Sequence, residues 1–590
     1  MEPCCGPHGL FLHRIREPVF APGRSARGGR LLVPGWCVSI LEGRLGDQSV
    51  RIIPLGGLGE IGRNMMVLEY DDNLIVIDAG LMFPENEMLG VDIVIPDMRY
   101  VIERRQKLRG IIVTHGHEDH TGALPFLLRK VWAPVYATPL TQGLIEVKLR
   151  EHNLRDVEFK PIRIETPISL GPFEVEFFRV THSIPDGVGL AIRTPIGTIV
   201  HSGDFKFDYS PVDGQRPDFA KLADLGRAGV LLLLGDSTNA ETPGYTPSEQ
   251  EVGQTFERLF AKAPGRVLVA TFASNISRVQ QVIDTAGRYN RKVAAVGRTM
   301  VNNVRVAMEL GCLRVPDGLL LSVEDINRLP PRQVAIVCTG SQGEPTSALV
   351  RMAYNDYRAV SLMPGDTVIV SARPIPGNEE FVNRTINNLF RLGANVYYDE
   401  LLDVHVSGHA AQEELKLLLN LLRPRFFVPI HGEYRHLVLH AGLAEKVGIP
   451  PQNIVVMESG EVLELTRTSA RVVDRVAEGY VFVDGRGVGD AGEAVLEDRR
   501  ILSQNGFLVA SVTVDSKTGR ILAGPEVVTR GLVYSQEADE FIEGAREVVE
   551  EVVRVASPSE LRGRIRESLI DYAYNEIGRR PLVVALVMEV

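Results

Sequence analysis

The sequence predicts an α/β protein with a mixed-sheet sandwich, an inserted parallel-sheet domain and a small α/β domain at its C-terminal end. Three observations predict this fold class. Short β-rich runs joined by Gly and Asp-Asp turns begin at Val50, as in a meander. After Ser248, strands and helices alternate regularly, which is typical of a parallel sheet. Near Asp399 the first pattern returns, so we expect the parallel-sheet domain to interrupt the sandwich.

The first region contains several predicted strands whose polar residues gather just past the strand ends. We expect strands in VRIIPLGG, MMVLEYDDNLIVIDAG, RGIIVTH, FEVEFFRVTH, VGLAIRT and GTIVHSGD, and a fully buried one in VLLLLGDS. The segment TGALPFLLRK has helical spacing. This half is therefore predicted to be a mixed sheet.

The region after Ser248 is predicted to be a βα repeat. The capping-box sequence SEQE opens a helix. Strand-then-polar-loop units follow in GRVLVATFASN, KVAAVGRT, RQVAIVCTGSQGE and DTVIVSARPIPGNE, separated by helical stretches such as SRVQQVIDTAGRYN. In such a parallel sheet, ligand-binding loops lie at the carboxyl ends of the strands.

The last region repeats the sandwich pattern and then changes. It begins with DVHVSGHA, the helix QEELKLLLNLL and the strand RFFVPIHGE. After the Gly-Asp-rich stretch VDGRGVGDAGEA, we expect a strand pair joined by the turn SKTG, two helices and a terminal strand. We expect a disordered leader or overcalled start at 1–48, sandwich domain at 49–244 and 401–470, inserted domain at 245–400, linker at 471–499 and C-terminal α/β domain at 500–590.

Composition restricts the class of protein. At 590 residues the chain is too long for one hydrophobic core. Its net charge of −11 argues at first against nucleic acid, because phosphate binding depends on Lys and Arg, although local charge decides such binding. Five irregularly spaced cysteines favour a reducing compartment. No apolar run approaches the roughly 20 residues of a membrane span, and we expect a cytoplasmic protein.

A dense cluster of histidines follows the predicted strand RGIIV. Residues 114–120 read THGHEDH, so His115, His117, Asp119 and His120 have H-x-H-x-D-H spacing. A loop can turn all four side chains inward, whereas on a strand His115 and His117 would face one side and His120 the other. Imidazole and carboxylate groups suit zinc. The spacing predicts a metal site.

Three further residues follow apolar strands in the same way. His182 lies in FRVTHSIPD, Asp204 in IVHSGDFKFD and His431 in FFVPIHGEYRH. Taken alone, each fits turn chemistry as well as metal ligation. Together with the quartet they supply seven candidate ligands, which is enough for two zinc ions with positions left open for water.

The order of these motifs resembles a known family. THGHEDH, THS, SGD and PIHGE resemble the metallo-β-lactamase fold, an αββα sandwich with a dinuclear zinc site at one edge. Asp204 and His431 are 227 positions apart, and the inserted domain fills the gap, as in the β-CASP nucleases. LGGLGEIGRNM, GDSTNAETPGYTPSE, TGSQGEP, DVHVSGHA and PIHGEYRH look like bacterial ribonuclease J, over residues 50 to 590. The inserted domain would be a Rossmann-like β-CASP domain.

The resemblance implies a role for each candidate residue. His115, His117 and His182 would hold one Zn²⁺, and Asp119, His120 and His431 the other, with Asp204 bridging them; Mn²⁺ or Mg²⁺ are alternative ions. Asp236, His409 and His431 match the three β-CASP motif positions. We expect Asp119, Asp236 and His409 to be catalytic. His409 would touch the scissile phosphate or assist proton transfer, and Asp236 would orient a histidine ligand.

Substrate handling is expected to fall to the inserted domain. Residues 251–300 carry 8 Lys and Arg against 3 Asp and Glu, which reverses the overall charge. The loops TGSQGE and SARPIPGNE offer hydroxyls and N–H groups near helix starts, although tight βα turns would read the same. The resemblance implies a pocket for a 5'-monophosphate, with these substrate-binding residues: Arg278, Ser341, Ser371, Ser407 and His409.

The resemblance implies a zinc-dependent ribonuclease with 5'-to-3' exonuclease and endonuclease activity on single-stranded RNA. It would prefer 5'-monophosphate ends and act in mRNA decay and rRNA maturation, and hydroxide held by two zincs would attack phosphorus. The alternatives are a nuclease for DNA, a hydrolase for a small ester or lactam, and a non-catalytic RNA-binding scaffold subunit. The long interval before His431 disfavours a small substrate, and the complete ligand set disfavours a scaffold.

We expect a homodimer or homotetramer, with other RNA-degradation proteins as further partners. The predicted C-terminal domain carries a helix with an apolar stripe that includes Phe541, Ala545 and Val549. Such a stripe must be buried, either against a second copy of the chain or inside the same domain.

Overall fold

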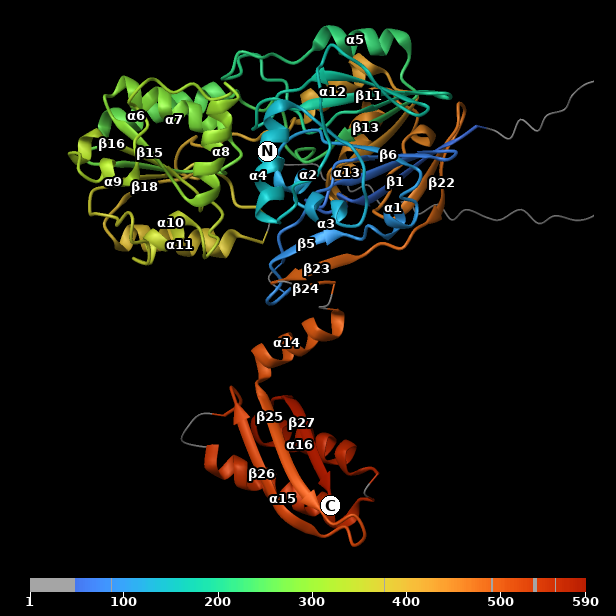
Figure 1. Ribbon diagram of the computed structural model, residues 1–590, viewed down its shortest axis with the longest axis vertical. Helices are drawn as coiled ribbons and strands as arrows, with labels where there is room; N and C mark the ends of the chain where they lie inside the picture. Colours follow the sequence, from blue (N-terminus) through green and yellow to red (C-terminus); the bar gives the residue numbers. More distant parts are fainter. Residues whose placement is uncertain are drawn as a thin grey trace, which may run out of the picture. The chain divides into compact units, whose positions relative to one another are not determined.

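A computed structural model describes residues 48–85, 87–375, 377–485, 487–489, 492–533, 538–557 and 559–590. The leader predicted at 1–48 lies outside these ranges except for its final residue. Two β-sheets face each other in the described part of the chain (Figure 1). One mixed sheet has eight strands, in the order β22 (Ala470–Arg475), β21 (Glu461–Leu465), β1 (Val50–Gly56), β3 (Met65–Tyr70), β4 (Asn73–Ile77), β6 (Leu108–Ile112), β7 (Val135–Ala137) and β8 (Phe159–Pro161).

The second sheet of the sandwich has six strands. Their order is β19 (Phe426–Ile430), β13 (Leu232–Asp236), β12 (Gly197–His201), β11 (Val188–Thr194), β10 (Phe173–Arg179) and β9 (Ile168–Leu170). β12, β13 and β19 are parallel neighbours although β19 comes some 190 residues later than β13 in the chain. The sheets share a core that includes Ile52, Leu68, Phe177, Leu234 and Val428.

Helices cover both outer faces of this sandwich. Residues of α1 (Arg99–Glu103), α3 (Leu124–Leu128) and α4 (Pro139–Glu151) pack on the eight-stranded sheet. Residues of α5 (Phe219–Ala228), α12 (Gln412–Leu422) and α13 (Tyr434–Lys446) pack on the six-stranded sheet. The predicted αββα sandwich is confirmed, because each of these helices buries apolar residues against the sheet that it covers.

A five-stranded parallel sheet lies between the two halves of the sandwich sequence. Its order is β15 (Lys292–Val296), β16 (Val334–Cys338), β14 (Val267–Ala270), β17 (Thr367–Val370) and β18 (Asn395–Tyr397). One face is covered by α6 (Glu249–Lys262), α7 (Ile276–Arg288) and α8 (Arg298–Glu309), the other by α9 (Val323–Ile326), α10 (Ala348–Ala353) and α11 (Glu379–Arg391) (Figure 1). Ser248 caps α6 as the sequence predicts.

The range 471–499, expected to be a linker, contains regular structure. β23 (Tyr480–Asp484) pairs with both β5 (Ile93–Pro96) and β24 (Gly487–Val488), and the range ends within α14 (Glu493–Asn505). Arg499 of α14 donates a hydrogen bond to Leu89 O and pairs with Asp484. Gly485, in a left-handed conformation (φ 58°), lies between β23 and β24, and Gly-rich composition alone does not distinguish such a strand pair from a free linker. Other short elements are β2 (Leu58–Gly59), which pairs with β20 (Gly432–Glu433), and the 3-10 helices η1 (Pro331–Gln333) and η2 (Pro451–Asn453).

The C-terminal region has its own sheet and core. β25 (Phe507–Val514) lies between β26 (Ile521–Arg530) and β27 (Leu582–Glu589), and α15 (Ala538–Val555) and α16 (Leu561–Ile577) pack on one face (Figure 1). The predicted helix stripe, including Phe541, Ala545 and Val549, is buried in this intramolecular core. Among the described helices, none has the length and apolar character that crossing a membrane requires.

Candidate metal centre

Polar residues from several strand ends converge at one edge of the sandwich. His115 lies three residues after β6, His182 three residues after β10 and Asp204 three residues after β12. Asp236 is the last residue of β13, and His431 follows β19 directly. The predicted convergence of residues far apart in the sequence is therefore present in the structure.

The THGHEDH segment, predicted to be a loop, is helical from Glu118 onward. His117 is the N-cap of α2 (Glu118–Thr121), and Asp119 and His120 lie in its first turn. The backbone of this turn packs on the chain after β4, where a Cβ at Gly80 would lie 1.5 Å from Asp119 O. Glycine is therefore required at position 80 for α2 to approach and direct its side chains inward.

Three histidines form the first group of donors. His115 Nε2 and His182 Nε2 each lie 3.1 Å from His117 Nδ1. His182 Nδ1 donates to Gly408 O at 2.8 Å, and because a carbonyl only accepts, the lone pair of His182 is on Nε2 and faces the group. Burial lowers the pKa of all three imidazoles, to about 4 for His117. Neutral imidazoles are the form that binds metal.

A second group contains Asp119, His120, Asp204 and His431. His120 Nε2 lies 3.4 Å from Asp119 Oδ2, and His431 Nε2 lies 3.3 Å from the same oxygen. His120 Nδ1 is 2.8 Å from Asp78 Oδ2, so its proton is on Nδ1 and its Nε2 lone pair faces the carboxylates.

Asp204 lies between the two groups. Its Oδ2 is 3.6 Å from His115 Nε2 and 3.9 Å from His182 Nε2 on one side. On the other side it is 3.2 Å from His120 Nε2 and 3.5 Å from His431 Nε2. A carboxylate in this position can bridge two cations, one in each group.

The donor set fits cations rather than a self-sufficient polar core. Lone pairs of His120 and His431 face the buried carboxylate of Asp204 and the half-buried carboxylate of Asp119, an arrangement that is repulsive unless positive charge lies between them. Although burial opposes it, Asp204 raises the pKa of His431 to about 10 and that of His120 well above its usual range. The site therefore attracts positive charge, and imidazole and carboxylate donors suit zinc.

Two residues that orient these donors, Asp78 and Thr238, were not predicted. Asp78, in a left-handed backbone conformation (φ 61°), accepts hydrogen bonds from Thr114 N and Thr114 Oγ1 as well as from His120. Thr238 Oγ1 lies 2.6 Å from His431 Nδ1. Asp78 follows β4 directly, so the strand-end rule that found His431 could have found it.

Asp236, which is buried, and His409, which is half-buried, form a pair beside the donor groups. His409 Nδ1 donates to Asp236 Oδ2 at 2.8 Å, and Asp236 Oδ1 also accepts from Thr238 Oγ1 and Thr238 N. Burial opposes ionisation of Asp236, but the charge and hydrogen bond of His409 outweigh it and hold the pKa of Asp236 far below its usual range. The His409 side chain keeps 18% of its surface exposed, and Nδ1 is the nitrogen that Asp236 engages.

The predicted substrate-binding residues of the inserted domain are buried in the structure. Ser341 and Ser371 follow β16 and β17, at the carboxyl ends of the parallel sheet, but both are buried. Arg278 is fully buried, where its guanidinium pairs with Glu249 Oε2 at 2.8 Å and donates to Ser371 Oγ and Val404 O. Arg278 therefore holds the loop after β17 instead of facing solvent.

The stretch DVHVSGHA places three polar side chains at alternate positions. Ser407 is half-buried and accepts hydrogen bonds from Asn239 Nδ2 and His409 N. His405, which was not predicted as a site residue, has a buried Nδ1 without a hydrogen-bond partner. Burial lowers the pKa of His405 strongly, and the nearby charges of Arg278, Arg373 and Lys206 lower it further. The H-x-S-x-H alternation is the signal that could have identified it.

Family models match the fold and this donor cluster in consecutive segments. They are the metallo-β-lactamase superfamily at residues 58–269, the ribonuclease J β-CASP domain at 264–389, the Zn-dependent metallo-hydrolase RNA specificity domain at 398–456 and the ribonuclease J C-terminal domain at 494–590. The protein is thus a metal-dependent hydrolase of the metallo-β-lactamase fold with a β-CASP domain.

Similarity to curated proteins extends over nearly the whole chain. Ribonuclease J of Thermus thermophilus is 47% identical, with 92% of this chain and 96% of the relative covered. Ribonuclease J 1 of Streptococcus pyogenes is 44% identical (92% and 98% covered), and ribonuclease J2 of Bacillus subtilis is 43% identical (92% and 99% covered). The chain belongs to the ribonuclease J family, and it is a metal-dependent ribonuclease.

Proposed function

We propose that the protein degrades single-stranded RNA with two zinc ions, as a 5'-to-3' exonuclease that prefers 5'-monophosphate ends and as an endonuclease. Its role would be cytoplasmic mRNA decay and rRNA maturation. The observation that carries the proposal is the convergence of seven donor side chains at one sandwich edge, in a chain of the ribonuclease J family.

The two donor groups would each hold one ion. His115, His117 and His182 would hold the first, Asp119, His120 and His431 the second, and Asp204 would bridge them. When bound, such a pair of zinc ions activates a water near neutral pH and neutralises the charge of a phosphate. Asp78, Thr238 and the Gly408 carbonyl keep the donor lone pairs directed inward.

His409 is the residue we assign to the scissile phosphate. Its Nδ1 is engaged by Asp236, which fixes the ring and leaves Nε2 directed elsewhere. The ring lies 4.8 Å from that of His182 and 5.3 Å from that of His431, so a phosphate at the metal groups would also meet His409. A proton on Nε2 can bond a phosphoryl oxygen or pass to the leaving 3'-oxygen.

We assign recognition of the 5'-monophosphate to the surroundings of His405. Its buried Nδ1 has no hydrogen-bond partner, and the charges of Arg373 and Lys206 act on the ring. Ser407 lies two residues further along, on the way to His409. The residues that would hold the terminal phosphate are thus close in sequence to His409, which we assign to the scissile phosphate. Each cut would create a new 5'-phosphate that fits the same place. This repetition supports processive 5'-to-3' digestion.

His405→Gln is expected to weaken discrimination between 5'-monophosphate and 5'-triphosphate RNA by about tenfold to a hundredfold, the effect of losing one hydrogen bond to a charged group. The measurement is kcat/KM on RNAs that differ only at the 5' end. His152→Gln, at the end of α4, is the matched control. Equal use of both RNAs by the wild type would overturn the proposed end preference.

Among the described residues of the C-terminal domain, one sheet face carries exposed apolar side chains. In β25, Val509 is paired with both Val528 of β26 and Val584 of β27, and Val528, Val584 and Leu586 are exposed on the face away from α15 and α16. We infer that a second copy covers this face. Self-association is expected because the face is self-complementary: Glu526 and Arg530 share it, so the two copies can pair opposite charges.

The double variant Val584→Asp and Leu586→Asp is expected to dissociate the oligomer, because charge in an apolar sheet interface is costly. Light scattering of the full chain should give a multiple of 65.0 kDa for the wild type and 65.0 kDa for the variant. Val555→Asp, which alters an exposed residue at the end of α15, is the control. An unchanged mass of the double variant would exclude this face as the interface.

A further inference from the structure

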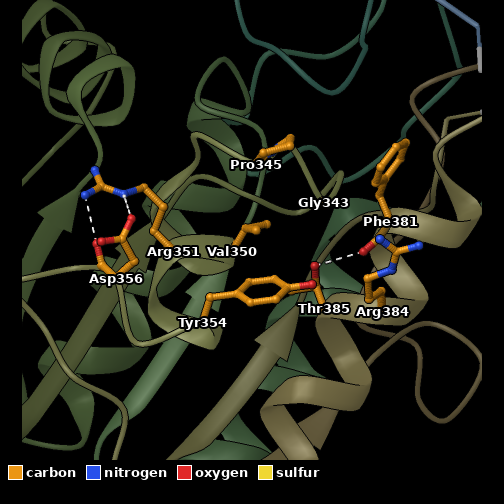
Figure 2. Close-up of a pocket in the computed structure, with 9 residues that line it drawn as sticks. All are labelled: Gly343, Pro345, Val350, Arg351, Tyr354, Asp356, Phe381, Arg384 and Thr385. Carbon is orange, nitrogen blue, oxygen red and sulfur yellow. Dashed lines mark hydrogen bonds and ion pairs between the residues drawn. The ribbon is translucent and has the colours of Figure 1, made fainter. Parts of the chain in front are cut away.

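A separate pocket lies in the inserted domain, between α10, α11 and the loop after β16. Its volume is about 310 Å³, near the lower end of the roughly 300–1,000 Å³ of small-molecule sites. Figure 2 shows that Tyr354 extends across it from the end of α10, while Phe381 and Arg384 reach it from α11. None of these residues belongs to the donor groups or to the phosphate pocket proposed above.

The pocket presents aromatic surface to solvent. Tyr354 is 53% exposed and Phe381 is 38% exposed, although α10 and α11 also carry buried apolar residues such as Met352 and Ile386. The inner wall is formed by Val350, which is buried. Exposed aromatic rings beside an apolar wall are suited to stacking with a planar base, and such stacking does not depend on base identity.

Two guanidinium groups flank this aromatic surface. Arg384 pairs with Glu380 one turn earlier in α11, and Arg351 pairs with Asp356. Both pairs are solvent-exposed, and exposed ion pairs contribute only about 0–1 kcal/mol. Each arginine can therefore exchange its carboxylate for a phosphate at little cost, and the planar guanidinium fits phosphate oxygens well.

The loop after β16 lines the pocket and also contacts the loop after β17. Gly343, in a left-handed conformation (φ 76°), packs so closely on α11 that a Cβ there would lie 2.6 Å from the Phe381 carbonyl carbon. On the other side of the loop, Gln342 Nε2 donates to Arg373 O, and Gln342 Oε1 accepts from Ile375 N. A ligand in the pocket would thus contact the same loop that supports the residues after β17.

We propose that this pocket binds one nucleotide of single-stranded RNA outside the catalytic cleft, with the base against Tyr354 and Phe381 and a phosphate at Arg384. The proposal rests on RNA being the substrate. An RNA nucleotide is favoured over a protein segment because it supplies both a planar ring and a phosphate, which are the two groups that the pocket can engage together. Longer RNAs would gain affinity from this second contact.

The test compares RNAs of two lengths on the full chain with metal removed by chelation. Both carry a 5'-hydroxyl, one of roughly four nucleotides and one longer than roughly 16 nucleotides. The double variant Tyr354→Ala and Arg384→Gln should bind the long RNA about fivefold to a hundredfold more weakly, the effect of one lost stacked base. It should bind and, with metal restored, cleave the short RNA as the wild type does.

Two controls keep this test specific. Arg391→Gln removes an exposed charge from the end of the same helix, α11, and Tyr574→Ala removes a similarly exposed tyrosine from α16. Equal affinity of the double variant and these controls for the long RNA overturns the proposal and leaves the pocket to a protein partner. If the wild type binds long RNA through Tyr354 but does not cleave RNA, the pocket proposal holds and the proposed catalysis is wrong.

A photocrosslinking experiment gives a second readout. Long RNA containing 4-thiouridine should crosslink to the segment that carries Tyr354 or to the one that carries Phe381, and the double variant should lose these crosslinks. Free UMP at a nucleotide concentration equal to that of the RNA should leave them in place. If UMP abolishes them, the pocket binds free nucleotides and the assignment to RNA is wrong.

Discussion

Asp204→Asn is expected to reduce RNA cleavage by about a thousandfold or more, because the two ions supply most of the charge stabilisation for phosphodiester hydrolysis. Asp204 Oδ2 lies within 3.9 Å of imidazole nitrogens from both donor groups. An amide has the same shape as the carboxylate but no negative charge, so the variant should also retain fewer ions. The rate is measured on 5'-monophosphorylated RNA, and the metal content by mass spectrometry.

Asp208→Asn is the matched control for this variant. Asp208 is also buried, lies four residues further along the chain and accepts a hydrogen bond from Glu249 N, but it is not part of either donor group. Its amide variant should keep both metal content and cleavage if it folds. An Asp204→Asn protein with a full complement of metal and an unchanged rate would show that Asp204 bridges nothing.

His409→Gln is expected to lower kcat by about a hundredfold to ten-thousandfold while the metal content stays unchanged, which is the range for loss of a general acid or base. His409 donates to Asp236 and lies beside the donor groups. Glutamine can still donate to Asp236 but cannot pass a proton to a leaving oxygen. Steady-state kinetics should therefore show the loss in kcat with little change in KM.

A metal-binding role for His409 would give a different result. Its ring nitrogen lies close enough to His182 and Asp204 to form a possible donor group with them. If His409→Gln loses metal in parallel with activity, His409 is a ligand, and the assignment to the scissile phosphate is wrong. His440→Gln is a suitable comparison, because His440 is buried and bonded to Ser237 but lies outside the donor groups.

The sequence was informative about the donor residues because their positions follow a simple physical rule. Polar side chains placed within a few residues of the ends of apolar strands gather at one sheet edge, and the structure brings His115, His182, Asp204 and His431 together there. The parallel sheet was equally predictable, since strand and helix periodicity alternate from Ser248 onward. The layered fold follows from burying each apolar face.

Other features depend on tertiary contacts that the sequence does not express. The burial of Arg278 requires knowing that Glu249, Ser371 and Val404 surround it. β23 forms because β5, almost four hundred residues earlier, offers a free edge. The apolar stripe of α15 gave no indication of whether its partner would be internal, and the structure places it in the C-terminal core.

The most direct test is crystallographic: anomalous scattering at the zinc absorption edge from crystals of the full chain grown with zinc. Two peaks are predicted roughly 3.5–4 Å apart, one surrounded by His115, His117 and His182, the other by Asp119, His120 and His431, with Asp204 contacting both. A protein that cleaves RNA and yet has no anomalous peak among these side chains would contradict the account.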